Sequence, residues 1–202
     1  LADACGGCIQ PQENPTVVTD HRMVMTISKD KSTLYDQIRY SGSPASFGWV
    51  LPYKGTIEFG VSADVVFEVL DGQTQTRVVG PPQNCPTNPC INTSSGGFAN
   101  SSSGNGALDG GVAVLKRDVV GPFEYVELAA TDANALFNWA QPNGFVINPD
   151  AKGVIDEYLA EKFNFLAVKL IPSAGVQDMR PIRISYPGMN TQLPLRMVAV
   201  GA

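Results

Sequence analysis

The strongest constraint on the fold of this chain is a series of short segments in which apolar and polar side chains alternate. In residues 22–28, Met23, Met25 and Ile27 share one face, which is the period of a β-strand. The same pattern predicts further strands over residues 34–40, 47–51, 112–119, 123–130, 163–171, 181–186 and 193–200. Short turns join most of these neighbours, which favours antiparallel pairing.

Helical spacing interrupts the strands at three places. The first helix is predicted to start at Ser62 as its N-cap and to end near Gly72. Its buried stripe is expected to contain Val66, Val69 and Leu70. The sequence therefore predicts a helix between the first strands and the hairpin over residues 112–130.

Two more helices are predicted after that hairpin. Thr131 is the expected cap of the first, and Asn148 with the following proline opens the second. Their inward-facing residues are expected to be Ala133, Leu136, Phe137 and Ala140, and then Val154, Ile155, Tyr158 and Leu159. The predicted fold class is α+β, with an antiparallel-rich sheet, about three helices packed on it and one long disulfide-bearing loop.

That loop covers residues 80–111, where proline, asparagine, serine and glycine replace any periodic pattern. It contains one close pair of cysteines, and the N-terminal segment contains the other, so the pairs are Cys5 with Cys8 and Cys85 with Cys90. An even number of cysteines in a weakly charged chain favours structural disulfides and an oxidising compartment. We expect the two local bridges, and bridges between the N-terminus and the loop are the alternative.

The same loop is the candidate partner-binding surface. Binding residues concentrate on loops that a rigid scaffold presents, and the few apolar side chains of this loop cannot offset the entropy cost of ordering it. The candidate contact residues are Asn92, Phe98, Asn100 and Asn105. A solvated insertion without a role is the alternative.

Length and charge limit the remaining classes. The chain has 202 residues, which suits one domain over residues 1–202 with a surface segment at 1–19. Its net charge of −5 and its scattered Lys and Arg residues argue against a nucleic-acid partner. No apolar run approaches the roughly 18 residues of a transmembrane segment. The N-terminus has no basic and apolar leader, so we expect a signal peptide to have been removed and the location to be extracytoplasmic.

Candidate catalytic residues are few. His21 is the only histidine, so any relay to a serine or cysteine nucleophile has to use it. The nucleophile-elbow, zinc-protease and phosphate-loop motifs are absent from the sequence. Two carboxylates could still hydrolyse a glycosidic bond. Asp64, Glu68 and Asp71 share one predicted helix, however, and a solvated helix face explains them more simply.

A metal site is the other chemical alternative. His21, Met23 and Met25 share one face of a predicted strand, and thioether with imidazole ligands suits copper(I). Two core methionines and a histidine at the exposed start of the strand are the simpler explanation. The cysteine spacing does not give two matching zinc knuckles, and Ile9 stands where haem attachment needs histidine. We therefore expect no cofactor.

Several stretches together resemble a known family. They are, in order, CGGC at 5–8, FGWVLP at 47–52, VGP at 120–122, LAATDA at 128–133, PIRI at 181–184 and PLR at 194–196. In this order the chain resembles an uncharacterised family of exported bacterial proteins, domain of unknown function 2330. The resemblance implies export and supplies no catalytic or ligand residue. Members of the family often continue further, so we expect a truncated or processed end at residue 202.

The sequence thus predicts a non-catalytic exported binding or structural module, such as an accessory subunit of a cell-envelope complex with a protein partner. The alternatives are a carboxylate-dependent hydrolase and a copper- or other metal-handling protein. A cleft lined by two carboxylates with raised pKa would favour the hydrolase. An exposed apolar patch with a polar rim would favour the binding module.

Overall fold

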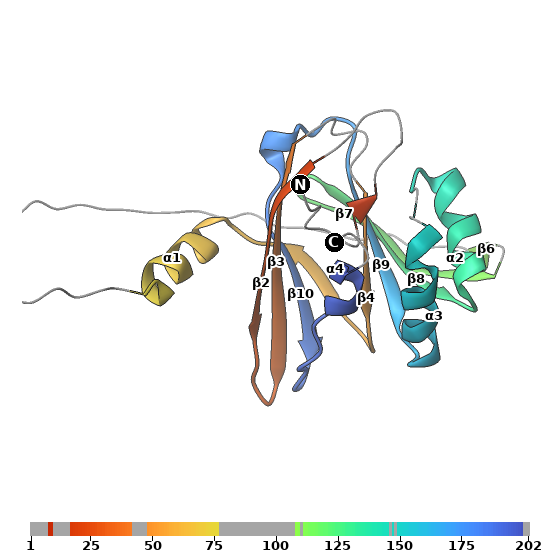
Figure 1. The fold of residues 1–202 in the computed structure, drawn as a ribbon, viewed down its shortest axis with the longest axis horizontal. Helices are drawn as coiled ribbons and strands as arrows, with labels where there is room; N and C mark the ends of the chain where they lie inside the picture. Colours follow the sequence, from red (N-terminus) through yellow and green to blue (C-terminus); the bar gives the residue numbers. More distant parts are fainter. Residues whose placement is uncertain are drawn as a thin grey trace, which may run out of the picture.

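Two antiparallel sheets are stacked face to face, and helices flank them on both sides (Figure 1). The computed structural model describes residues 8–9, 17–41, 48–76, 108–109, 111–145, 147 and 149–199. The predicted α+β class with antiparallel pairing is confirmed, with the strands divided between two sheets. The predicted disulfide-bearing part of the loop lies outside the described residues.

The larger sheet, sheet A, has six strands in the order β1-β4-β9-β8-β7-β6. Their bounds are Cys8–Ile9 for β1, Gly48–Tyr53 for β4, Leu108–Asp109 for β6, Val112–Val120 for β7, Phe123–Ala130 for β8 and Asn164–Leu170 for β9. The predicted hairpin is confirmed as β7 and β8. The strand β6 pairs with β7 and falls inside residues 80–111, so the last part of the predicted loop is strand instead.

The smaller sheet, sheet B, has four strands in the order β2-β3-β10-β5. Their bounds are Val17–Thr26 for β2, Lys31–Ser41 for β3, Glu58–Val61 for β5 and Ile182–Pro187 for β10. The strand β2 starts five residues before the predicted segment 22–28. The sequence does not predict β5, because four residues are too few to show an alternation.

The two sheets enclose the first hydrophobic core. Trp49 and Leu51 of β4 point towards sheet B, where they pack with Leu34 and Ile184. Val50 lies between them in sequence and therefore points to the opposite face of sheet A. Only 2% of Trp49 is exposed, so the prediction that this strand is a core element is confirmed.

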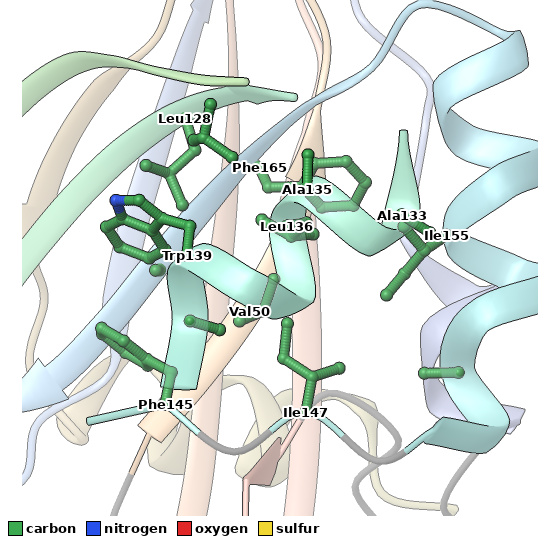
Figure 2. Close-up of a cluster of buried hydrophobic side chains, with 14 of the residues drawn as sticks. Val50, Leu128, Ala133, Ala135, Leu136, Trp139, Phe145, Ile147, Ile155 and Phe165 are labelled. Atoms are coloured by element: carbon green, nitrogen blue, oxygen red, sulfur yellow. The ribbon is translucent and has the colours of Figure 1, made fainter. Parts of the chain in front are cut away.

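The second core lies between the outer face of sheet A and two helices, α2 (Ala133–Ala140) and α3 (Lys152–Ala160). Figure 2 shows Leu136 and Trp139 of α2 with Val50 and Phe165 of the sheet. The side chain of Asp132 accepts a hydrogen bond from the backbone N–H of Ala135, so the N-cap is Asp132 and not the predicted Thr131. Short 3-10 turns occupy Gln141–Asn143, Pro149–Ala151 and Val176–Asp178.

The predicted strand over residues 193–200 is wrong. Residues Leu195–Ala199 form a short helix, α4, whose Met197 is buried in the second core. The Arg196 guanidinium lies 4.8 Å from the centre of the Tyr158 ring and pairs with Glu157 of α3 and with Glu161, the residue that follows the helix. These contacts to α3 are distant in sequence, so the local alternation of apolar residues could not reveal them. In the part of the chain described here, each helix is too short or too polar to span a bilayer.

Candidate functional site

The helix α1 (Val65–Thr74) lies on the outer face of sheet B, away from sheet A (Figure 1). Its single buried side chain is Phe67. The prediction that Val69 belongs to the buried stripe is wrong, because this side chain is half exposed. The helix does not end near Gly72 as predicted but continues to Thr74. The residue at its N-cap position is Asp64, whose side chain forms no capping hydrogen bond, instead of the predicted Ser62.

A polar network fixes α1 to sheet B. Arg22 of β2 donates from Nη1 to Asp71 at 2.5 Å, and from Nε and Nη2 to the Gln37 carbonyl at 3.0 and 2.6 Å. Gln37 of β3 in turn donates to the carboxylate of Asp64. The Arg22 guanidinium also stands 5.3 Å from the centre of the Phe67 ring, which adds a cation–π contact. Both ends of the helix are therefore tied to neighbouring strands.

The side of α1 that faces away from the sheet carries an exposed apolar ridge, which we call the α1 ridge. It consists of Val65 and Val69, of which 55% and 51% are exposed. Because residues four apart are neighbours on a helix surface, the two side chains form one patch. Asp64 and Glu68 are exposed beside them and give the patch an acidic rim. The α1 ridge is thus a small apolar patch with an acidic rim.

A hollow of about 480 Å³ separates α1 from β2, and we call it the α1–β2 groove. Residues 22–24 of β2 form one wall, and Phe67, Leu70, Asp71 and Thr74 of α1 form the other. A second hollow, of about 360 Å³, opens at one end of the sandwich and is lined by residues 54–56, 186–187 and 189–192.

A histidine–aspartate pair lies inside the sandwich. His21 Nε2 is 2.8 Å from Asp36 Oδ1, and the side chains are 6% and 0% exposed. The His21 ring meets Trp49 of sheet A edge-on, with 5.9 Å between ring centres. Burial raises the pKa of Asp36, and the hydrogen bond and charge of His21 oppose that rise. Among the described residues Asp36 Oδ2 has no hydrogen-bond partner.

A second buried carboxylate lies on the facing sheet. Tyr53 of β4 reaches past β9 and donates its hydroxyl to Glu127 Oε2 of β8 at 3.1 Å. Burial raises the pKa of Glu127, and the pKa of Tyr53 is raised by burial and then by the charge of Glu127. Asp36 and Glu127 are thus two carboxylates with raised pKa. Both are enclosed, and neither lines the α1–β2 groove or the hollow at the sandwich end.

The structure places the three candidate metal ligands on the inner face of β2. His21 is committed to Asp36, while Met23 and Met25 pack half-buried against the first core. His21 is enclosed rather than at the exposed start of the strand, because β2 begins at Val17. In the described part of the chain, no three His, Cys, Asp or Glu side chains group as metal ligands do.

Sequence reasoning missed Asp36 although a signal was present. In the strand predicted over residues 34–40, Asp36 stands at the inward position between Leu34 and Ile38. An acid at an apolar position of a strand predicts either a buried polar pair or an error in the assignment.

The remaining candidate residues lie outside the described ranges. They are Cys5, Cys85, Cys90, Asn92, Phe98, Asn100 and Asn105. Cys8 is described only as backbone, in β1 opposite Trp49 of β4. The disulfide pairing and the loop contacts therefore stay predictions.

Comparison with known proteins gives one finding. The model of a family described as "Uncharacterized protein conserved in bacteria (DUF2330)" matches residues 1–202. No curated protein and no solved structure matches the chain.

Proposed function

This chain belongs to the DUF2330 family of bacterial proteins, and we propose that it is a non-catalytic extracytoplasmic binding module that holds a protein partner on its α1 face. An accessory subunit of a cell-envelope complex is the role we assign to such a module. The two close cysteine pairs support the extracytoplasmic location, since disulfides persist in oxidising compartments.

The α1 ridge is the observation that carries the proposal. Two valines, each about half exposed, are held outward by a helix that is tied to Arg22 through Asp71 and to Gln37 through its N-cap residue Asp64. A helix without tertiary contacts would be marginal at this length, because short helices are not stable in water. The network thus keeps an apolar patch in a fixed position, which lowers the entropy cost of binding.

The position of the buried acids supports a binding module over a carboxylate hydrolase. A general acid needs a raised pKa, and Asp36 and Glu127 both have one. A general acid must also lie within hydrogen-bond reach of the substrate. Both carboxylates instead face the interior between the sheets, where core side chains surround them.

The proposal is tested by removing the ridge without disturbing the framework. Val65→Ser with Val69→Ser removes the apolar patch, and such exposed changes cost roughly 0.5 kcal/mol or less of unfolding free energy. The matched control is Leu115→Ser with Val119→Ser, which changes two similarly exposed apolar residues on β7. Tagged versions of all three proteins are purified from the native bacterium after cross-linking.

We expect one partner protein to co-purify with the wild type and with the β7 control, and to be lost from the α1 variant. Equal melting temperatures of the three proteins show that the loss is not due to unfolding. Equal recovery of the partner by the α1 variant would refute a binding role for this face.

A further inference from the structure

The α1 ridge continues along the helix as a longer seam. Val65, Val69 and Gly72 are spaced by four and then three residues, which places them along one line of the helix surface. Phe67 is buried on the opposite side of the helix, so this line faces away from sheet B. Among the described residues, nothing outside its own helical turn lies within 4 Å of where a Cβ atom of Gly72 would be. A seam with this spacing and an open position at its end is a surface on which another helix packs.

A line of carboxylates runs beside the seam. Asp64, Glu68 and Asp71 each precede one seam residue, so they share its spacing of four and three. The charge of Asp71 is compensated by Arg22, whereas Asp64 accepts a hydrogen bond from the neutral amide of Gln37. Within the described ranges neither Asp64 nor Glu68 forms an ion pair, and α1 contains no lysine or arginine. The seam therefore borders on uncompensated negative charge.

This charge selects among the possible occupants of the seam. An anionic lipid surface or a nucleic acid would bring like charge against Asp64 and Glu68, which disfavours binding. A second copy of the chain would bring the same acids face to face, because its own α1 has no basic residue. Charges that flank an apolar helix seam commonly set the choice of partner helix. The complementary surface is therefore apolar at its centre and basic at its side.

From this geometry we infer that the partner protein binds α1 through a basic amphipathic helix. Its apolar residues cover Val65 and Val69, and one of them reaches the open position at Gly72. Its lysine or arginine side chains pair with Asp64 and Glu68. This inference rests on the proposed binding function and names the chemistry of the partner.

The test uses the whole protein with a photo-cross-linking amino acid at Gln73, which is exposed on α1 beside the seam. After irradiation in the native bacterium, mass spectrometry identifies the cross-linked stretch of the partner. A synthetic peptide of this stretch is then titrated against the purified wild type and its variants, and circular dichroism reports the helix content of the bound peptide.

Glu68→Lys reverses the charge beside the seam, and Glu68→Gln only removes it. Glu68 is exposed, and in the described part of the chain it has no ion pair to lose, so both variants should keep the wild-type melting temperature. The matched control is Asp30→Lys, which makes the same charge change at an exposed position between β2 and β3.

We expect the cross-linked stretch to carry apolar residues spaced by three and four with lysine or arginine beside them, and to be helical when bound. Glu68→Lys should weaken binding about tenfold or more, because like charges then face each other. Glu68→Gln should weaken it less, and Asp30→Lys should bind as the wild type does. Added salt should also weaken binding, since the Debye length falls from about 10 Å at 0.1 M to about 3 Å at 1 M.

Binding that Glu68→Lys and salt leave unchanged would overturn the inference, and so would an equal loss in Asp30→Lys. A cross-linked stretch that is acidic or extended, or that belongs to a second copy of this chain, would overturn it as well. Each of these outcomes still finds a protein on the α1 face and leaves the proposed function standing. A cross-link to lipid, or none at all, would refute the proposed function together with the inference.

Discussion

His21 Nε2 and Asp36 Oδ1 lie 2.8 Å apart inside the sandwich, on neighbouring strands of sheet B. The pair is surrounded by apolar side chains from both sheets, and Trp49 of sheet A meets the His21 ring edge-on. Tyr186 of β10 is also affected by the charge of Asp36. Burial, together with this charge, raises the pKa of Tyr186 to about 12. Burial therefore makes the ionised form of Asp36 less favourable in the core than it is in water.

The raised pKa of Asp36 predicts that its contribution to stability falls as pH rises. The folded protein holds the Asp36 proton at a pH where the unfolded chain has lost it, so the folded state binds more protons. Stability from this group is fully present below about pH 4, the ordinary pKa of aspartate, and is lost as pH rises through the folded pKa. Asp36→Asn removes this dependence. The unfolding free energy of the variant should therefore increase relative to that of the wild type as the pH rises.

Urea unfolding at a series of pH values from 4 to 8 measures this difference. Asp156→Asn is the control, because Asp156 lies on α3 with its side chain partly exposed and pairs there with Lys152. Parallel stability curves for the wild type and Asp36→Asn would contradict the prediction.

Asp132 should show the opposite dependence. It caps α2, and the hydrogen bond from the Ala135 N–H, followed by that from Thr131, lowers its pKa. Its contribution is present above about pH 4 and is lost as pH falls through the lowered pKa. Asp132→Ala should therefore destabilise the protein at neutral pH, and the difference from wild type should shrink in acid. A thermal unfolding series between pH 2 and 7 checks this, and a difference that is constant with pH would count against it.

Trp49→Ala should cost roughly 3–5 kcal/mol of unfolding free energy, the typical effect of removing a large aromatic side chain from a core. Trp49 is buried between the sheets and contacts His21, so the cavity would lie next to a buried polar pair. Leu115→Ala, on the half-exposed surface of β7, should stay within about 0.5 kcal/mol of wild type. Thermal melts compare the three proteins, and a Trp49→Ala variant that melts within a degree or two of wild type would mean that the residue is not a core element.

Phe67→Ala should release α1 from the sheet while leaving the sandwich folded. Phe67 is the one buried side chain of this helix and stacks with Arg22, so its loss removes about 3–5 kcal/mol from the docking of α1. Hydrogen exchange should become faster in α1 and stay unchanged in β3 and β10. Val69→Ala is the matched control on the exposed side of the same helix, and uniform acceleration across all elements would show that Phe67 supports the whole fold instead.

Elements fixed by nearby residues were predictable from the sequence. The hairpin of β7 and β8 follows from two alternating segments around Gly121, which adopts a φ of 59° that glycine tolerates best. The helices α2 and α3 follow from apolar spacing that a single segment contains. In each case the information lies within a few residues, because turn geometry and helix periodicity are local properties of the chain.

The tertiary structure alone decided which strands share a sheet and what each face contacts. Residues 195–199 alternate like a strand, yet Arg196 and Met197 are held in a helix by α3 and the second core. The spacing of α1 marked Val69 as buried, and the contacts of Arg22 and Gln37 turned Phe67 inward and left Val69 outward. Asp36 is a neighbour of His21 only because β2 and β3 pair in one register. By itself the sequence determined which segments have an apolar face, whereas long-range packing decided what lies against each face, since a hydrogen-bond or burial partner distant in the chain leaves no local pattern.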